Sequence, residues 1–251
     1  MTIEFSIDGN VAHLQINRPE RRNAINFGLL EEISESVDQA IQAEVRAFIV
    51  SGAGEHFCAG ADLSELEDQS FTVRLRDVLD RLAGMNAVTI SAISGACMGL
   101  GMQLAMACDL RVAGHDAKFA VPVSKLGLMV DLWTVRKLAA LAGHSTARQL
   151  LTTGMPIDVA RAYQVGFVQH LVEDGSDPLS VALGLAETVS ALAPLSIVGS
   201  KLGLDLVERD PGSRSSEDEY RVAFDRAWSS ADLVEGRVAF VERRPPEFNG
   251  N

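Results

Sequence analysis

Apolar and polar residues alternate in two short runs at the start of the chain. The runs lie on either side of Asp8-Gly9-Asn10, within the segment TIEFSIDGNVAHLQINRP at positions 2–19. Alternation is typical of half-buried strands, and an Asp-Gly pair tolerates the positive φ of a tight turn. We therefore expect the chain to begin with a β-hairpin.

The spacing of apolar residues then switches between helical and strand periods. Residues 27–43 have helical spacing, and residues 46–52 form a short apolar run that ends at a glycine. This alternation of helix and strand continues. We expect a helix over 62–84, a strand over 87–94, a helix over 100–108 and a strand over 109–114. Strands that alternate with helices predict an α/β fold with parallel pairing.

From about residue 175 the pattern is helical only. We therefore expect an α/β core over 1–190 and a C-terminal helical region over 191–251. Such a region has little apolar area of its own, so it should pack on the core or on a neighbouring subunit.

The net charge and the cysteine content disfavour several kinds of binding partner. The 251 residues carry a formal charge of −12, which disfavours nucleic acid and anionic membranes, so an anionic ligand needs a local basic cluster. The three cysteines lack metal-site spacing and follow no secretory leader, which predicts free thiols in a cytoplasmic protein without a metal. No apolar run reaches the roughly 20 residues that span a bilayer.

Two turns rich in small residues follow predicted strands, in the segments SGAGEHFCAGADLSEL (51–66) and SGACMGLGMQLAMACDLRVA (94–113). Free N–H groups at a helix start favour an anion or a developing oxyanion, and two donors from two turns would form an oxyanion hole for a thioester carbonyl. Ordinary strand-to-helix turns, with glycines for close packing, are the alternative. The glycine spacing does not match a dinucleotide-binding fingerprint.

Three segments together resemble the enoyl-CoA hydratase/isomerase, or crotonase, superfamily over nearly the whole chain. They are NRPERRNAI (17–25), FCAGADL (57–63) and GACMGLGMQLAMACDLRVA (95–113). The chain is most similar to a mycobacterial branch thought to bind long acyl-CoA without hydrating it. The resemblance implies a crotonase-like spiral of ββα units, with a C-terminal helical region that forms homotrimers, often paired into hexamers.

The resemblance also implies site residues. The N–H groups of Ala61 and Leu100 would bind the thioester oxygen, and the coenzyme A thioester would be ligand or substrate, with no cofactor. Contacts to coenzyme A would come from Arg22, Asn23, Ala24, Ala59, Asp62, Leu63 and, commonly from a neighbouring subunit, Phe240 and Arg243.

Two positions depart from the family pattern. Family hydratases carry a glutamate at each of the positions that read Gln103 and Val123 in this chain. Hydration needs one group to activate water and another to deliver a proton, and each such group contributes about 10²- to 10⁴-fold in rate. We therefore expect little or no hydratase turnover.

Asp131 is the remaining acidic candidate, within the otherwise apolar end of KFAVPVSKLGLMVDLW at 118–133. Several family isomerases carry an aspartate at this position, and one carboxylate can move a proton between two carbons of an enoyl thioester. The alternative role is the N-cap of a helix formed by LWTVRKLAALAG. Nearby Met98, Met129 and Trp133 would be core residues or line an acyl pocket.

Three functional hypotheses follow. The leading one is an acyl-CoA-binding protein of fatty-acid metabolism with little or no turnover. The others are an enoyl-CoA isomerase that uses Asp131 as its base and a weak enoyl-CoA hydratase.

Overall fold

The N-terminal hairpin forms as its sequence pattern predicts. The computed structural model describes the whole chain except residues 1, 63–68, 174 and 210–212. Strands β1 (Ile3–Asp8) and β2 (Val11–Ile16) pair antiparallel, and Gly9 in the turn has a φ of 55°. A positive φ favours glycine because it has no Cβ.

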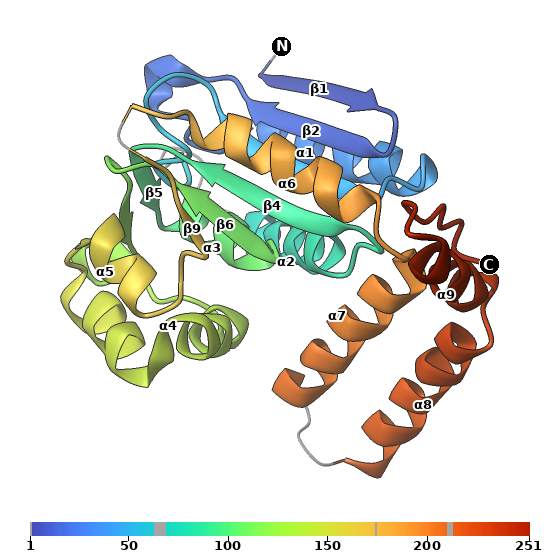
Figure 1. The fold of residues 1–251 in the computed structure, drawn as a ribbon. Helices are drawn as coiled ribbons and strands as arrows, with labels where there is room; N and C mark the ends of the chain where they lie inside the picture. The colour runs from blue at the N-terminus through green and yellow to red at the C-terminus, as the bar shows by residue number, and fades with distance from the viewer. Residues whose placement is uncertain (1, 63–68, 174, 210–212) are drawn as a thin grey trace. The chain divides into compact units, whose positions relative to one another are not determined.

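The larger sheet has the order β1-β2-β3-β4-β6-β9, and every pair after the hairpin is parallel (Figure 1). Its remaining strands are β3 (Ala47–Gly52), β4 (Val88–Ile93), β6 (Leu110–Ala113) and β9 (His170–Leu171). The residues of β4 are all buried, as expected for a parallel strand covered on both faces. The predicted α/β class is confirmed.

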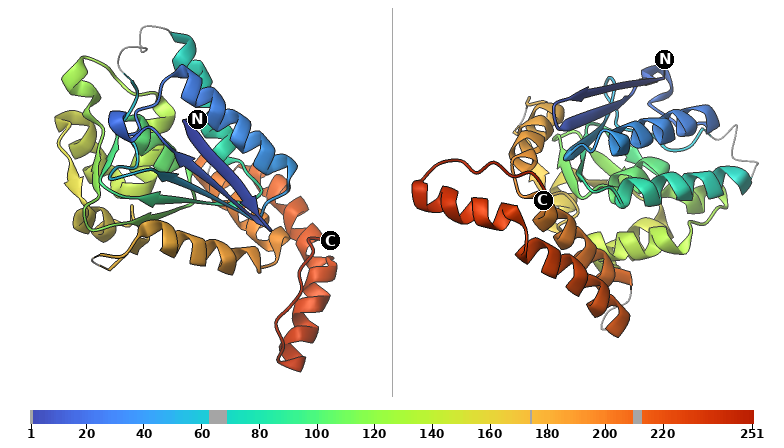
Figure 2. Two further views of the ribbon diagram at one scale, coloured as in Figure 1. Left: turned by 90° about the horizontal axis from the view of Figure 1, so that it is seen from above. Right: turned by 90° about the vertical axis from the view of Figure 1, so that its right-hand side faces the viewer.

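Helices cover both faces of this sheet. On one face lie α1 (Phe27–Gln42), α2 (Gln69–Ala83) and α3 (Leu100–Ala107), and α1 packs beside α2 (Figure 2). Helix α6 (Pro178–Ser190) crosses the opposite face (Figure 1). The helix expected over 62–84 is confirmed from Gln69 onward, and residues 63–68 lie outside the described part of the chain.

A second, smaller sheet was not apparent from the pattern. It contains β5 (Ala96–Met98), β7 (Lys118–Ala120) and β8 (Ile157–Asp158) in the order β5-β7-β8. Strands of two or three residues are too short to show a periodicity of their own. Beside it lie the 3₁₀ helix Pro122–Leu126, α4 (Leu132–Thr153) and α5 (Val159–Gln164).

The chain divides into two compact units, Met1–Ala186 and Glu187–Asn251. The second contains α7 (Pro194–Arg209), α8 (Arg214–Trp228) and α9 (Ala231–Glu242), which confirms the predicted helical end of the chain. In the described residues no single helix is long and apolar enough to cross a bilayer; α6 and α7 meet the length and composition only as a bent pair.

Candidate functional site

The two turns rich in small residues lie against each other. The N–H of Cys58 donates to the Ala96 carbonyl at 3.0 Å, and the N–H of Met98 donates to the Cys58 carbonyl at 2.9 Å. A Cβ on Gly101 would lie 2.3 Å from the Cys58 carbonyl oxygen. The start of α3 can therefore contact this segment so closely only because residue 101 has no side chain.

Each turn presents a backbone N–H for which the described residues offer no acceptor. Around Ala61, the flanking groups are bonded, since Ile25 N–H donates to Gly60 at 2.9 Å and Asp62 N–H donates to Ile25 at 2.8 Å. The N–H of Ala61 has no acceptor among the described residues. Leu100 is the first residue of α3, so its N–H has no partner within the helix, and the described part of the chain offers none elsewhere.

Both N–H groups belong to residues that line one pocket of about 410 Å³. A Cβ on Gly60 would lie 4.0 Å from the Leu100 nitrogen, which shows how closely the two turns approach. The wall is mostly apolar. Its residues are Ala59, Gly60, Ala61, Phe71, Thr72, Leu75, Gly99, Leu100, Gln103, Pro122, Val123, Leu126, Leu128, Met129, Val130 and Asp131.

The pocket brings together residues from distant parts of the sequence. It is lined by the two predicted amide donors, Ala61 and Leu100, and by Gln103, Val123, Met129 and Asp131. Met98 instead lines a separate hollow with His56 and Asp116. Two amide donors beside an apolar chamber can stabilise negative charge on a carbonyl oxygen while the chamber holds an apolar chain.

Asp131 caps α4, as the alternative interpretation of its sequence predicts. Its Oδ1 accepts hydrogen bonds from the Thr134 N–H at 3.0 Å and from the Thr134 hydroxyl at 2.5 Å. The Thr134 hydroxyl in turn accepts from Gln103 Nε2 at 2.7 Å. Asp131 is therefore both a helix cap and part of the pocket wall, so the cap does not by itself decide its chemistry.

An arginine that the sequence analysis missed lies beside this carboxylate. Arg76 Nη1 is 3.7 Å from Asp131 Oδ2, and the guanidinium lies 3.8 Å over the ring of Trp133. Trp133 thus packs on Arg76 and is not part of the pocket wall. No local pattern indicates the arginine, whereas the spacing of Asp131 and Thr134 is that of an N-cap and its third helical residue.

The loop predicted to contact coenzyme A is held in an unusual backbone conformation. Arg22 and Asn23 have φ values of 52° and 57°. The buried Asn23 amide donates to the carbonyls of Ala53 and His56 at 2.9 and 2.6 Å, and the Arg22 carbonyl accepts from the Ala59 N–H at 2.9 Å.

These bonds attach the loop at 22–24 to the first of the two turns. Arg18 also forms an ion pair with Asp62, at 3.1 Å. Ala24 donates its N–H to the Arg21 carbonyl at 3.1 Å. Leu63, the other predicted contact in this region, lies outside the described residues.

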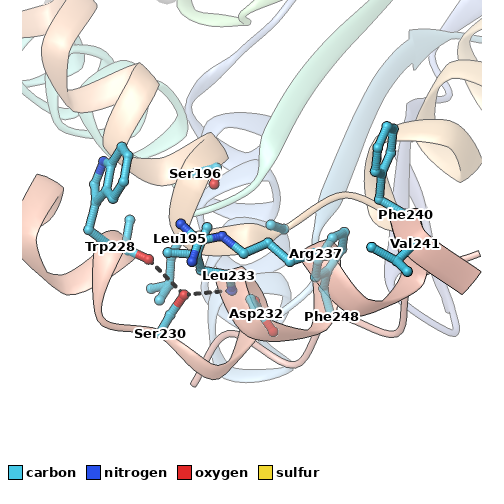
Figure 3. Close-up of a pocket in the computed structure, with 13 residues that line it drawn as sticks. Leu195, Ser196, Trp228, Ser230, Asp232, Leu233, Arg237, Phe240, Val241 and Phe248 are labelled. Atoms are coloured by element: carbon cyan, nitrogen blue, oxygen red, sulfur yellow. Dashed lines mark hydrogen bonds between the residues drawn. The ribbon is translucent and has the colours of Figure 1, made fainter.

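The remaining two predicted contacts belong to the C-terminal unit. The Phe240 side chain is 86 % exposed, and Arg243 ends α9 with a φ of 57°. Phe240 borders a hollow of about 650 Å³ within this unit, together with Trp228, Arg237 and Phe248 (Figure 3).

The buried cysteines beneath the turns are unsuited to nucleophilic chemistry. Burial raises the pKa of the Cys58 thiol to about 12, and burial also holds the pKa of Cys97 well above its usual range. A thiol must ionise to act as a nucleophile. Both side chains therefore act as packing groups under the pocket.

An α/β core whose two small-residue turns line one pocket defines the class of the protein, and comparison with known proteins agrees. Residues 6–251 match the family model described as enoyl-CoA hydratase/isomerase. The chain belongs to the enoyl-CoA hydratase/isomerase family and has the crotonase fold.

Individual relatives cover all or nearly all of the chain. It is 40% identical to “Probable enoyl-CoA hydratase echA6” of Mycobacterium leprae, over 96% of both chains. Among solved structures, it is similar to an enoyl-CoA hydratase of Bacillus anthracis, with a TM-score of 0.91, 26% identity and 100% of both chains covered. An enoyl-CoA hydratase of Mycobacterium marinum aligns with a TM-score of 0.88 and 27% identity, again over 100% of both chains.

Proposed function

We propose that this protein binds acyl thioesters of coenzyme A, with the thioester oxygen on the N–H groups of Ala61 and Leu100. The observation that carries the proposal is that both N–H groups lack acceptors among the described residues and belong to the wall of one pocket. A backbone donor without an acceptor is unfavourable unless a ligand or water supplies one.

We also propose that hydration of an enoyl thioester is slow or absent. The pocket wall that contains the amide donors also has a carboxamide at Gln103 and an isopropyl group at Val123, and neither exchanges protons near neutral pH. The role of the protein in fatty-acid metabolism would then be to bind and present acyl-CoA in the cytoplasm.

Isomerase activity is the second candidate because Asp131 lines the pocket. Against it, Asp131 Oδ1 already accepts two hydrogen bonds from Thr134, and Oδ2 faces Arg76. A base must receive a proton from the substrate on a free carboxylate oxygen, and these partners already occupy Oδ1 and lie beside Oδ2. We therefore favour a structural role for Asp131.

The coenzyme A end of the ligand would lie along Arg22, Asn23, Ala24, Ala59, Asp62 and Leu63. Phe240 and Arg243 would reach it from a neighbouring subunit of a homotrimer or hexamer. Exposed apolar side chains in the C-terminal unit, including Leu204 at 72 % and Val241 at 80 %, support burial of this unit in an assembly.

The test is titration calorimetry with a medium or long acyl-CoA, with free coenzyme A as the reference ligand. We expect saturable binding of acyl-CoA and weaker binding of free coenzyme A. Leu100→Pro removes one of the two N–H donors at a helix position that accepts proline, and should weaken acyl-CoA binding about tenfold or more. The control, Leu100→Ala, shortens the side chain but keeps the N–H group.

Absence of binding across chain lengths would overturn the proposal. Crotonyl-CoA hydration, followed by absorbance, separates the binding role from a hydratase. Turnover of about 10 per second or more would be ordinary enzymatic activity, and it would refute the second part of the proposal.

A further inference from the structure

Part of the pocket wall continues onto the outer surface of the protein, between the 3₁₀ helix Pro122–Leu126 and α4. We call residues 126–132, which join these two elements, the tip. Four large apolar side chains of the tip are exposed, those of Leu126, Leu128, Met129 at 90 % and Leu132 at 61 %. Exposed apolar side chains grouped in this way mark a site of contact with a protein, a membrane or a ligand.

Hydrogen bonds hold both ends of the tip. Gly127 ends the 3₁₀ helix with a φ of 71°, and the Leu128 N–H donates to the Val123 carbonyl at 3.0 Å. At the other end, Asp131 caps α4 by accepting from the Thr134 N–H. The apolar side chains of the tip would therefore turn inward only with loss of these bonds.

Lysine and arginine flank the tip. Lys125 precedes it, and Arg136 shares one face of α4 with Leu132, one helical turn away. Both cations are exposed, and neither forms an ion pair with a residue that the structure describes. Asp131, the acid within the tip, already faces Arg76. The tip is therefore an apolar segment with positive charge before and after it.

This part of the chain is positive although the whole chain is acidic. The segment 118–171, from β7 to β9, contains six lysines and arginines and two aspartates, a formal charge of +4 in a chain whose total is −12. Salt screens exposed charges that are more than about 8 Å apart, so the acidic remainder of the chain acts weakly at the tip. The total charge disfavours an anionic partner, but the local charge favours one.

The chemistry of the tip fits a lipid surface better than a protein. Protein interfaces use aromatic anchors and many hydrogen bonds, whereas the large exposed side chains of the tip are leucines and a methionine, and the neighbouring Trp133 packs on Arg76. A symmetric contact with a second copy would bring two positive segments together. Apolar side chains beside lysine and arginine are the features by which proteins insert into the interface of an anionic bilayer.

We propose that the tip docks the protein on an anionic phospholipid bilayer. Leu128, Met129 and Leu132 enter the boundary between headgroups and acyl chains, and Lys125 and Arg136 contact lipid phosphates. Because the tip also lines the pocket, an acyl chain would pass between bilayer and pocket without crossing bulk water. Only this last step rests on the proposed function, since the docking itself needs no acyl-CoA.

Co-sedimentation with vesicles, without acyl-CoA and at physiological ionic strength, tests the docking. One set of vesicles is phosphatidylcholine alone, and the other is an equal mixture of phosphatidylcholine and phosphatidylglycerol. We expect the full chain to bind the mixed vesicles at least about tenfold more tightly, because each cation near an anionic surface contributes about fivefold.

Substitutions outside the pocket wall show which residues bind. Lys125→Gln and Arg136→Gln should each weaken binding to the mixed vesicles about fivefold. Leu132→Ser keeps both cations, removes an apolar side chain and should weaken binding about fivefold to tenfold. The controls are Arg221→Gln, an exposed cation in α8, and Ile41→Ser, an exposed apolar residue in α1. Both controls should bind as the wild type does.

Other occupants of the tip give different results. Binding of poly-glutamate as tight as that of the mixed vesicles, with Leu132→Ser changing neither, would indicate an acidic protein as the partner and overturn the proposal. A change of oligomeric state in Leu132→Ser, measured by analytical ultracentrifugation without vesicles, would identify the tip as a contact between copies and overturn it too.

The remaining outcomes separate this inference from the proposed function. Wild-type binding that is absent, equal for the two kinds of vesicle, or weakened as much by the controls would overturn the docking. If acyl-CoA still binds in titration calorimetry, the proposed function stays intact. Vesicle binding without acyl-CoA binding would overturn the proposed function and leave the docking supported.

Discussion

Two parts of the pocket wall use different chemistry. One part consists of backbone N–H groups at Ala61 and Leu100, held in place by hydrogen bonds between the segments around Cys58 and Cys97. The other part consists of the side chains of Gln103 and Val123, at the two positions where the family resemblance leads us to expect glutamates in hydratases. The proposed binding of an acyl thioester depends on the first part, and the proposed lack of hydration depends on the second.

The two parts of the pocket wall depend on the sequence in different ways. A backbone donor requires that the segments around it pack closely, which is why the absence of a side chain at Gly101 matters more than the identity of Leu100. A proton-transfer group requires a particular side chain, so a single substitution removes it. Binding and turnover can therefore be lost independently within one pocket.

The largest effect is expected from introducing a glutamate at both side-chain positions. Gln103→Glu together with Val123→Glu should raise crotonyl-CoA hydration by at least about 10²-fold over the wild type, because each acid or base contributes on that order. Gln103→Glu alone is the matched control and should gain little, since one carboxylate cannot both activate water and protonate carbon. The measurement is loss of the enoyl absorbance. A double variant no faster than the wild type would show that the geometry of the pocket, and not only these two residues, prevents hydration.

The close packing that supports the backbone N–H groups is tested by adding one methyl group at Gly101. Gly101→Ala would place a Cβ 2.3 Å from the Cys58 carbonyl oxygen, and overpacking of this kind costs about 2 kcal/mol or more of unfolding free energy. Urea unfolding measures the loss. Gly184→Ala, in α6 with no atom within 4 Å of the new Cβ, is the control; it should be neutral or stabilise by up to about 1 kcal/mol. Equal stability of the two variants would contradict the close contact.

The cap role of Asp131 predicts a smaller effect. Asp131→Ala should lower the free energy of unfolding by about 1 kcal/mol, whereas Asp131→Asn should change it little, because asparagine caps a helix about as well as aspartate. Thermal melts measure both. A 3-enoyl-CoA to 2-enoyl-CoA conversion assay on the same proteins separates the roles, and robust wild-type isomerisation lost in Asp131→Asn without loss of stability would favour the isomerase.

The smallest expected effect concerns the cysteines, which we expect not to react with a thiol reagent in the native protein. All three cysteines are buried, and the pKa of Cys58 is raised to about 12 by burial. At pH 8 its thiol therefore stays protonated, and a raised pKa means that the thiolate forms only near pH 12. A colorimetric thiol reagent should label no cysteine in the native protein and three after denaturation. Rapid labelling of the native protein would show that the segments under the pocket open readily.

Much of the fold could be predicted because its signals are local. The hairpin turn at Gly9, the apolar runs of β3 and β4 and the helical spacing from residue 178 onward depend on nearest neighbours along the chain. The cap at Asp131 was one of two local interpretations, and its geometry is confirmed. The small sheet of β5, β7 and β8 was missed because its strands are too short to carry a pattern and form only by pairing across distant segments.

The alternation of strands and helices, the two turns of small residues and the neutral side chains of Gln103 and Val123 follow from the amino-acid sequence alone, because they depend on local propensity and on residue identity. Three further features exist only in the folded chain: Ala61 and Leu100 line the same pocket, Gln103 donates to Thr134, and Arg76 faces Asp131. Those contacts join residues more than 25 positions apart, and their geometry depends on how the helices pack on the sheet, which no local pattern encodes.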